Sequence, residues 1–260
     1  RTAASVVSVG TEKAMIDVAK KSLLGKALAR PDWVKQVLDK VRTEGFAEAY
    51  RQSFARLDMP VPLGYASAGI VQEVGRGVAD FAVGDRVACS GSGYASHAEL
   101  ASVPRNLCCP VPAGVGFAEA SFAALGGIAL EAVRCARVEL GHRVVVIGLG
   151  LLGQLAVQIL AAAGCHVLGM DTSPARNDLA LVHGAEAVSP GGEPSAVVAA
   201  CRAFTRGHGA DSVIILASAP SNEPLELAAE LSRERGRVVA TGLVGLEAPR
   251  KPFYEKELEL

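Results

Sequence analysis

The chain has 260 residues, of which 50% are hydrophobic and 20% are charged, and its formal net charge is −1. This composition excludes an intrinsically disordered protein, and the near-zero charge gives no electrostatic attraction to nucleic acid or to an anionic membrane. A chain of this length can form two domains with buried cores, and we expect its partners to be small molecules.

Two further features of the composition bear on where the protein works. Residues 144–170 carry no charged side chain, but Gly148 and Gly150 would break a membrane-spanning helix, so we interpret the stretch as buried core. The six cysteines form no C-x-x-C pair, which is typical of free thiols in a reducing compartment. We therefore expect a cytoplasmic protein with no membrane segment.

The first part of the chain is predicted to begin as a strand and to continue as helices. Residues 1–12 are rich in β-prone side chains and end at Gly10-Thr11. From about 12 to 58, apolar residues recur at helical spacing, and Pro31 suits the first position of a helix. We interpret this segment as a helical hairpin packed on the main body.

The middle of the chain, from about 60 to 112, is predicted to form a small β domain. Glycine and proline recur between short apolar runs, which predict strands at 71–75, 84–89 and 94–100. An alanine-rich helix is expected over 117–138. Beyond Gly141, apolar strands at 144–148, 165–170, 186–188, 211–216 and 236–242 alternate with helices near 151–163, 174–183, 194–205 and 223–233. This alternation predicts an α/β fold with a doubly wound parallel sheet.

The strongest chemical signal follows the first of those strands. Gly148-x-Gly150-x-x-Gly153 joins a strand to a helix, and Asp171 ends the next strand. In such a fingerprint the first glycine permits a tight turn, the second lets a pyrophosphate approach the backbone, and the third lets helix pack on strand. The helix start attracts phosphate, and the acid can accept hydrogen bonds from a ribose. The pattern predicts dinucleotide binding by Gly148, Leu149, Gly150, Leu151, Leu152, Gly153 and Asp171.

Two segments resemble the medium-chain dehydrogenase/reductase superfamily. EVGRGVADFAVGDRVA (73–88) is similar to that family's β-domain signature, and residues 111–153 resemble its connection into the nucleotide domain. The likeness runs from about residue 64 to 246. It implies a partial GroES-like β-barrel domain over 1–125, with a helical insertion at about 12–58, and a Rossmann domain over 126–260. It also implies a homodimer as one arrangement.

The same resemblance predicts that the chain holds no metal. Zinc-bearing members have a cysteine in a C-G-T-D segment, a histidine in G-H-E and a third ligand before the nucleotide domain. Here these places read Val9-Gly10-Thr11-Glu12, Gly64-Tyr65-Ala66 and, for the third, Leu125. Valine and leucine cannot ligate zinc. The family's four-cysteine lobe is also absent from the sequence.

The loss of zinc ligands resembles a narrower, zinc-less branch of the superfamily. That branch contains bacteriochlorophyllide-type dehydrogenases and the medium-chain half of bidomain oxidoreductases. In bidomain proteins a glucose–fructose-oxidoreductase-like domain follows, and residues 251–260 resemble the strand that precedes it. The resemblance therefore implies that this chain is part of a longer protein.

The resemblance also implies roles for individual residues. In a reaction that uses NAD(H), Asp171 would hold the adenosine ribose, and Arg176 either flanks the adenine or is a solvated helix charge. The loops carrying Ala217, Ser218, Gly242 and Leu243 would border the nicotinamide. Tyr65 takes the place of the lost histidine, where its hydroxyl either assists proton transfer with Thr11 and Glu12 or only fills space. His97 and His142 are expected at a strand edge and in a turn, outside the site.

Three functions remain open from the sequence alone. The first is a zinc-independent, NAD(H)-dependent oxidoreductase acting on an alcohol and its carbonyl. The second is an NADPH-dependent quinone or enoyl reductase, against which Asp171 counts because a basic or small residue would be expected there. The third is a dinucleotide-binding module that has no catalytic activity.

Overall fold

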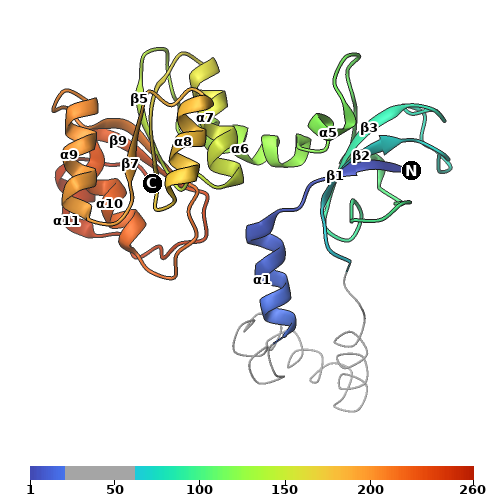
Figure 1. The fold of residues 1–260 in the computed structure, drawn as a ribbon, viewed down its shortest axis with the longest axis horizontal. Helices are drawn as coiled ribbons and strands as arrows, with labels where there is room; N and C mark the ends of the chain where they lie inside the picture. The colour runs from blue at the N-terminus through green and yellow to red at the C-terminus, as the bar shows by residue number, and fades with distance from the viewer. Residues whose placement is uncertain (21–61) are drawn as a thin grey trace. The chain divides into compact units, whose positions relative to one another are not determined.

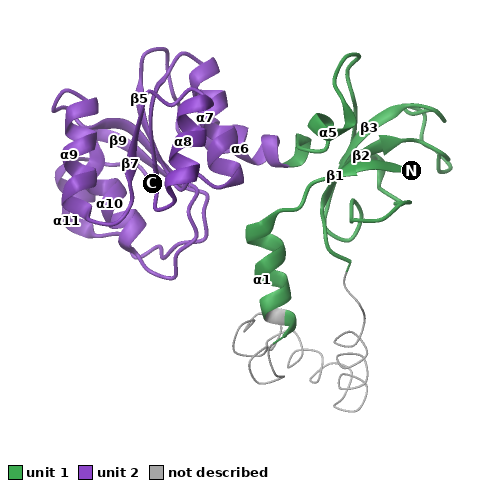
Figure 2. Cartoon of the chain, viewed as in Figure 1, with its two compact units in different colours: residues 1–124 green, residues 125–260 purple. Residues whose placement is uncertain are grey.

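The structure is a computed structural model, and it describes residues 1–20 and 62–260. Most of the expected helical insertion, residues 21–58, therefore lies outside the described residues. The chain divides into two compact units, Arg1–Ala124 and Leu125–Leu260, which are shown in green and purple in Figure 2. No helix in the described part of the chain is long and apolar enough to span a membrane.

The first unit is built on an antiparallel sheet with the strand order β1-β2-β3-β4. Its core is small: Ala68, Ala88 and Ala120 pack together with Val115 and Phe117. The strands are β1 (Thr2–Ser5), β2 (Ala66–Ile70), β3 (Arg86–Ser90) and β4 (Cys108–Pro110), and the helices are α1 (Val9–Ala19), the short 3-10 helix η1 (Arg105–Leu107) and α5 (Phe117–Ala120).

Several boundaries predicted for this unit are wrong. The opening strand ends at Ser5, and helix α1 already begins at Val9, so Thr11 and Glu12 lie in its first turn. Residues 71–75 and 94–100 form no strand. Within 91–98 the backbone turns instead, with the Ala95 N–H bonded to the Gly91 carbonyl and the Ala98 N–H to the Ser96 carbonyl. Strand β2, which was not predicted, has four small residues of low β-propensity before Ile70.

The second unit confirms the predicted doubly wound parallel sheet, which lies between helices in Figure 1. Its strand order is β7-β6-β5-β8-β9. The order reverses at β5, which lies between β6 and β8. The strands are β5 (Arg143–Ile147), β6 (His166–Asp171), β7 (Ala187–Pro190), β8 (Ala210–Ile215) and β9 (Ser232–Ala240). The helices are α6 (Ala123–Cys135), α7 (Leu151–Ala162), α8 (Pro174–Val182), α9 (Pro194–Phe204), α10 (Glu223–Leu231) and α11 (Arg250–Glu255).

Helices cover both faces of this sheet, which explains its continuous apolar strands. Val144 and Val146 of β5 face a core cluster that includes residues of α6 and α7. Val145 and Ile147 face the opposite cluster, to which α9 and α10 contribute. Because alternate side chains of a strand point to opposite faces, both sets must be apolar. The sheet is therefore a rigid platform for the loops at its carboxyl edge.

The structure corrects two further predictions, one of a helix and one of a strand. The single helix expected over 117–138 is two helices, and the Ser121 hydroxyl at the break donates to the Ala118 carbonyl at 2.6 Å. The first half of the strand expected at 251–260 is instead part of helix α11. Only Glu259 forms a parallel bridge, to Arg237 of β9.

Candidate functional site

The glycine fingerprint folds tightly at the carboxyl end of β5. Gly148 has a φ of 93°, and a Cβ atom on it would lie 2.5 Å from the Ala217 backbone nitrogen. A Cβ on Gly153 would lie 2.0 Å from the Gly148 carbonyl oxygen. Gly150 differs from both, because a Cβ there would meet no atom within 4 Å. The first and third glycines are thus required by the protein's own packing, whereas the second leaves open space.

Helix α7 presents its amino end at that open space. The helix begins at Leu151 after Gly150, which has no side chain that could cap it. The backbone N–H groups of Leu151, Leu152 and Gly153 therefore have no partner within the helix and can bind an anion. Leu149 is different from its neighbours: its side chain is fully buried and its N–H already donates to Asp171. It supports the loop and offers no free group to a ligand.

Asp171 lies at the end of β6, with its side chain 6% exposed. Its Oδ2 atom accepts the Leu149 N–H at 2.9 Å, and its Oδ1 atom accepts the Ser173 N–H at 2.9 Å. Arg176 Nη1 lies 3.3 Å from Oδ2 and 3.5 Å from Oδ1 of Asp171, and its place beside an adenine stays a prediction. These four contacts use the roughly four acceptor positions of the carboxylate, so a ribose hydroxyl would bind Asp171 in place of the long contacts from Arg176.

The loops after β8 and β9 meet the fingerprint at the same edge of the sheet. The Leu216 and Ala217 N–H groups both bond to the Ile147 carbonyl, and Ala219 N–H bonds to that of Leu243. A Cβ on Gly242 would lie 1.9 Å from the Ala217 carbonyl oxygen. Ser218 and Leu243 are exposed beside these contacts. The structure thus brings the sequence-predicted loops together at the topological switch point, where ligands of doubly wound sheets bind.

Gln154 is a residue of this region that the sequence analysis missed. Its side chain is buried in α7, and Nε2 donates to the carbonyl oxygens of Leu149 and Arg176 at 3.0 and 2.8 Å. Oε1 is therefore an acceptor, and it receives the Nδ1–H of His183 at 3.0 Å. The amide ties the glycine loop to helix α8. An amide side chain within a largely apolar helix is the feature of the sequence from which this role could have been predicted.

These groups fit a dinucleotide. Unpaired N–H groups suit its pyrophosphate, the space beside Gly150 lets phosphate approach, and Asp171 suits a ribose diol.

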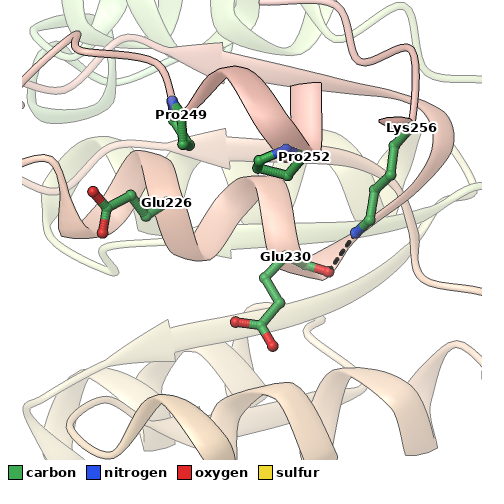
Figure 3. Close-up of a pocket in the computed structure, with 5 residues that line it drawn as sticks. All are labelled: Glu226, Glu230, Pro249, Pro252 and Lys256. Carbon is green, nitrogen blue, oxygen red and sulfur yellow. Dashed lines mark hydrogen bonds between the residues drawn. The ribbon is translucent and has the colours of Figure 1, made fainter. Parts of the chain in front are cut away.

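Figure 3 shows a different pocket, between α10 and α11, where Lys256 donates to the carbonyl oxygens of Ala229, Glu230 and Ser232. Burial lowers the pKa of Lys256. This pocket lies at the amino end of β9, the opposite edge of the sheet, and Lys256 closes the end of α10 there.

The catalytic residues predicted in the first unit lie on two segments. Thr11 and Glu12 are in the first turn of α1, and Tyr65 precedes β2 with its side chain half-buried. Thr11 Oγ1 accepts a hydrogen bond from the Ser8 hydroxyl at 3.3 Å. No hydrogen bond joins the Tyr65 hydroxyl to any residue that the structure describes. The role of Tyr65 in proton transfer with Thr11 and Glu12 stays a prediction.

His97, predicted to lie outside the site at a strand edge, is instead bonded to Glu12. Its Nε2 lies 3.1 and 3.2 Å from the two carboxylate oxygens of Glu12. The backbone N–H of His97 donates to the Leu63 carbonyl, and a Cβ on Gly64 would lie 2.9 Å from the His97 ring. His97 thus joins the segment of Glu12 to that of Tyr65. His142 does lie in a turn, with its Nδ1 accepting the Glu139 N–H.

Two family models match the chain. The model described as "Alcohol dehydrogenase GroES-like domain" matches residues 38–163, and that described as "Zinc-binding dehydrogenase" matches 152–259. The chain belongs to the medium-chain dehydrogenase/reductase superfamily. The predicted combination of a GroES-like domain with a Rossmann domain is therefore confirmed. Members of this superfamily are oxidoreductases that use a nicotinamide dinucleotide, which is the ligand class that the second unit fits.

Individual relatives of this chain carry names that refer to different substrates. It is 25% identical over 234 residues to 2-dehydro-3-deoxy-L-galactonate 5-dehydrogenase of Pseudoalteromonas atlantica, covering 79% of this chain and 67% of that one. It is 36% identical over 163 residues to the quinone oxidoreductase of Rattus norvegicus, covering 59% and 49%. The crystal structure of 2R,3R-butanediol dehydrogenase from Bacillus subtilis superposes with a TM-score of 0.68 at 25% identity, covering 79% and 66%. The chain thus spans about half to two thirds of the length of these relatives.

By the resemblance, the family's zinc-ligand places correspond to Val9, Tyr65 and Leu125 in this chain. Val9 begins α1 and is 69% exposed, whereas Leu125 in α6 is fully buried. Within residues 1–20 and 62–260, no three histidine, cysteine or acidic side chains gather as a metal site would require. The donor chemistry at these places therefore does not fit zinc.

Proposed function

We propose that the chain is part of a zinc-independent, NAD(H)-dependent oxidoreductase that interconverts an alcohol and its carbonyl compound. The observation that carries this proposal is the Asp171 carboxylate, held by the Leu149 N–H at the end of β6 beside the open amino end of α7. Bound there, NAD(H) would supply the hydride acceptor or donor. The chain's own residues bind and orient it and handle the proton.

The charge of Asp171 favours NAD(H) over NADP(H). A 2′-phosphate would lie against the carboxylate, and two unit charges about 4 Å apart at an effective dielectric of about 20 repel by roughly 4 kcal/mol. Arg176 beside Asp171 reduces this repulsion, and its side chain is 57% exposed, so it can also reach toward a phosphate. A clear preference for NAD(H), without complete exclusion of NADP(H), follows from the two charges together.

Replacing Asp171 with asparagine is expected to narrow this preference. The amide oxygen still accepts the Leu149 N–H while the charge is removed, although the amide nitrogen cannot accept the Ser173 N–H as Oδ1 of Asp171 does. Affinities for NADH and NADPH, measured by fluorescence titration, should differ by at least about tenfold in the unmodified protein, which corresponds to about 1.4 kcal/mol. In Asp171→Asn the difference should fall to about threefold or less.

Asp178 offers a matched control, because it is an exposed aspartate on α8. Asp178→Asn should keep the preference of the unmodified protein. Equal affinity of the unmodified protein for both cofactors would contradict the role of Asp171.

The zinc-independent part of the proposal rests on the side chains at the family's ligand places. Val9 and Leu125 have no donor atom, so Tyr65 alone cannot hold a catalytic metal. An alternative way to stabilise a developing alkoxide is a hydroxyl donor; Tyr65 stands at one of these places, and Thr11 lies two positions after Val9. We propose Tyr65, Thr11 and Glu12 as the groups that replace the metal's function.

A second candidate function is a quinone or enoyl reductase that uses NADPH. The 36% identity to the rat quinone oxidoreductase favours it. Asp171 counts against this function because its carboxylate would repel the 2′-phosphate of NADPH. Reduction of 1,4-benzoquinone with NADPH, faster than any NAD-linked alcohol oxidation by the same sample, would favour this second function.

A further inference from the structure

Glu12 is a carboxylate held away from water. The residue is 5% exposed, although it lies in the first turn of a helix whose other residues are largely exposed. Its Oε1 atom accepts the Ser8 N–H at 2.9 Å, and both oxygens contact His97. A backbone amide cannot pass a proton on, whereas an imidazole can. Among the described residues, His97 is therefore the outlet for a proton on Glu12.

The bonding of His97 continues from Glu12 to the surface. The ring's Nδ1 lies 2.9 Å from the hydroxyl oxygen of Ser5, and Ser5 is an exposed residue of β1. The His97 side chain itself is 26% exposed, compared with 7% for that of Glu12. Glu12, His97 and Ser5 thus form a hydrogen-bonded chain that leads from a buried carboxylate to solvent.

This chain passes between the two segments that carry the proposed catalytic residues. Glu12 follows Thr11 directly, and the His97 ring packs on Gly64, which precedes Tyr65. The close approach requires glycine at position 64, whose φ is 91° and where a Cβ would also lie 2.8 Å from the His97 nitrogen. The fold therefore fixes His97 where it contacts both segments.

We propose that His97 relays the reaction's proton between Glu12 and solvent. The inference rests on the proposed function. Oxidation of an alcohol removes one hydride, which nicotinamide accepts with its two electrons, and one hydroxyl proton. That proton reaches Glu12, and from Glu12 it passes to Nε2 of His97. The ring releases a different proton from Nδ1 to Ser5, whose hydroxyl passes one to water, so one proton enters this hydrogen-bonded series and one leaves. Proton exchange with solvent, to which the His97 side chain is 26% exposed, returns the ring to its starting tautomer before the next turnover. Carbonyl reduction runs the same path in reverse.

A simpler role for the pair is a clamp that holds α1 against the sheet. The two roles predict different behaviour for glutamine at position 97. A glutamine amide can donate to Glu12 and accept from Ser5, so it preserves a clamp, but it cannot take up and release protons as imidazole does. Loss of turnover in a stable His97→Gln protein is therefore specific to a relay.

The experiment compares His97→Gln and His97→Ala with the unmodified protein. Turnover is followed by NADH formation with 2,3-butanediol, xylitol, sorbitol and 2-propanol as probes, alongside NADH affinity and thermal unfolding. His166→Ala is the matched control, because His166 pairs with Glu186 in an exposed pair of the second unit. We expect kcat to fall about 10²-fold in both His97 variants, with unchanged NADH affinity. Added imidazole should restore part of kcat in His97→Ala, and His166→Ala should match the unmodified protein.

The outcomes separate the relay from the function on which it rests. Unchanged kcat in His97→Gln, or a loss in His97→Ala that imidazole does not restore, would overturn the relay and leave the oxidoreductase standing. The proposed function, and the relay with it, would be rejected if the unmodified protein formed no NADH from any probe and oxidised no NADH with the corresponding ketones.

Discussion

Replacing Gly150 with alanine is expected to remove NAD(H) binding while leaving the second unit folded. A Cβ at this position meets no protein atom within 4 Å, so the packing has room for it. The same Cβ would occupy the space through which a pyrophosphate approaches the amino end of α7. We expect NADH affinity to fall at least about 30-fold, a cost of about 2 kcal/mol, with a thermal unfolding midpoint close to that of the unmodified protein.

Gly153→Ala, three residues away, provides the opposite comparison. Its Cβ would lie 2.0 Å from the Gly148 carbonyl oxygen, so the helix must move away from the strand. Overpacking of this kind costs about 1–3 kcal/mol, which exceeds the helix-propensity gain of about 1 kcal/mol from glycine to alanine. The unfolding midpoint should therefore fall. Full NADH affinity in Gly150→Ala, or an unchanged midpoint in Gly153→Ala, would contradict these roles of the two glycines.

Tyr65→Phe is expected to lower turnover about 10²-fold. The substitution keeps the half-buried ring and removes only the hydroxyl, so packing before β2 is preserved. A hydroxyl that donates to a developing alkoxide stabilises the transition state more than the ground state, and its removal lowers kcat more than it changes KM. NADH affinity should be unchanged, because the nucleotide fingerprint lies in the second unit.

Tyr94→Phe is the control for this substitution, because Tyr94 lies in the same unit and is 47% exposed. It should turn over the same alcohol at the rate of the unmodified protein. Equal turnover by Tyr65→Phe would show that Tyr65 only fills the space of the lost histidine.

The second unit could be predicted closely from the sequence because its signals are local. Long apolar strands such as β5 alternate with helices, and glycines mark the turns between them. The fingerprint and Asp171 are likewise close in the chain and are joined by one hydrogen bond in the structure. The largest error in length concerns strand β9, which was predicted to begin at 236. It begins at Ser232, because Ala210 pairs with Ser232 across an irregular register.

The first unit was harder to predict because its strands and contacts depend on distant segments. Residues 66–69 are small and carry no alternating pattern, yet with Ile70 they form the inner strand β2, which pairs with β1 and β3. His97 and Glu12 are 85 positions apart, and no spacing rule relates them. Their pairing follows from the turn over 91–98, where the sequence had predicted a strand.

Zinc content and NAD-dependent alcohol oxidation, measured on the same purified sample before and after treatment with a chelator, test zinc-independent hydride transfer without reference to any variant. We expect far less than one zinc per chain, together with turnover that the chelator does not change. The contrary result would be about one zinc per chain and turnover that falls as zinc is removed and returns when zinc is restored.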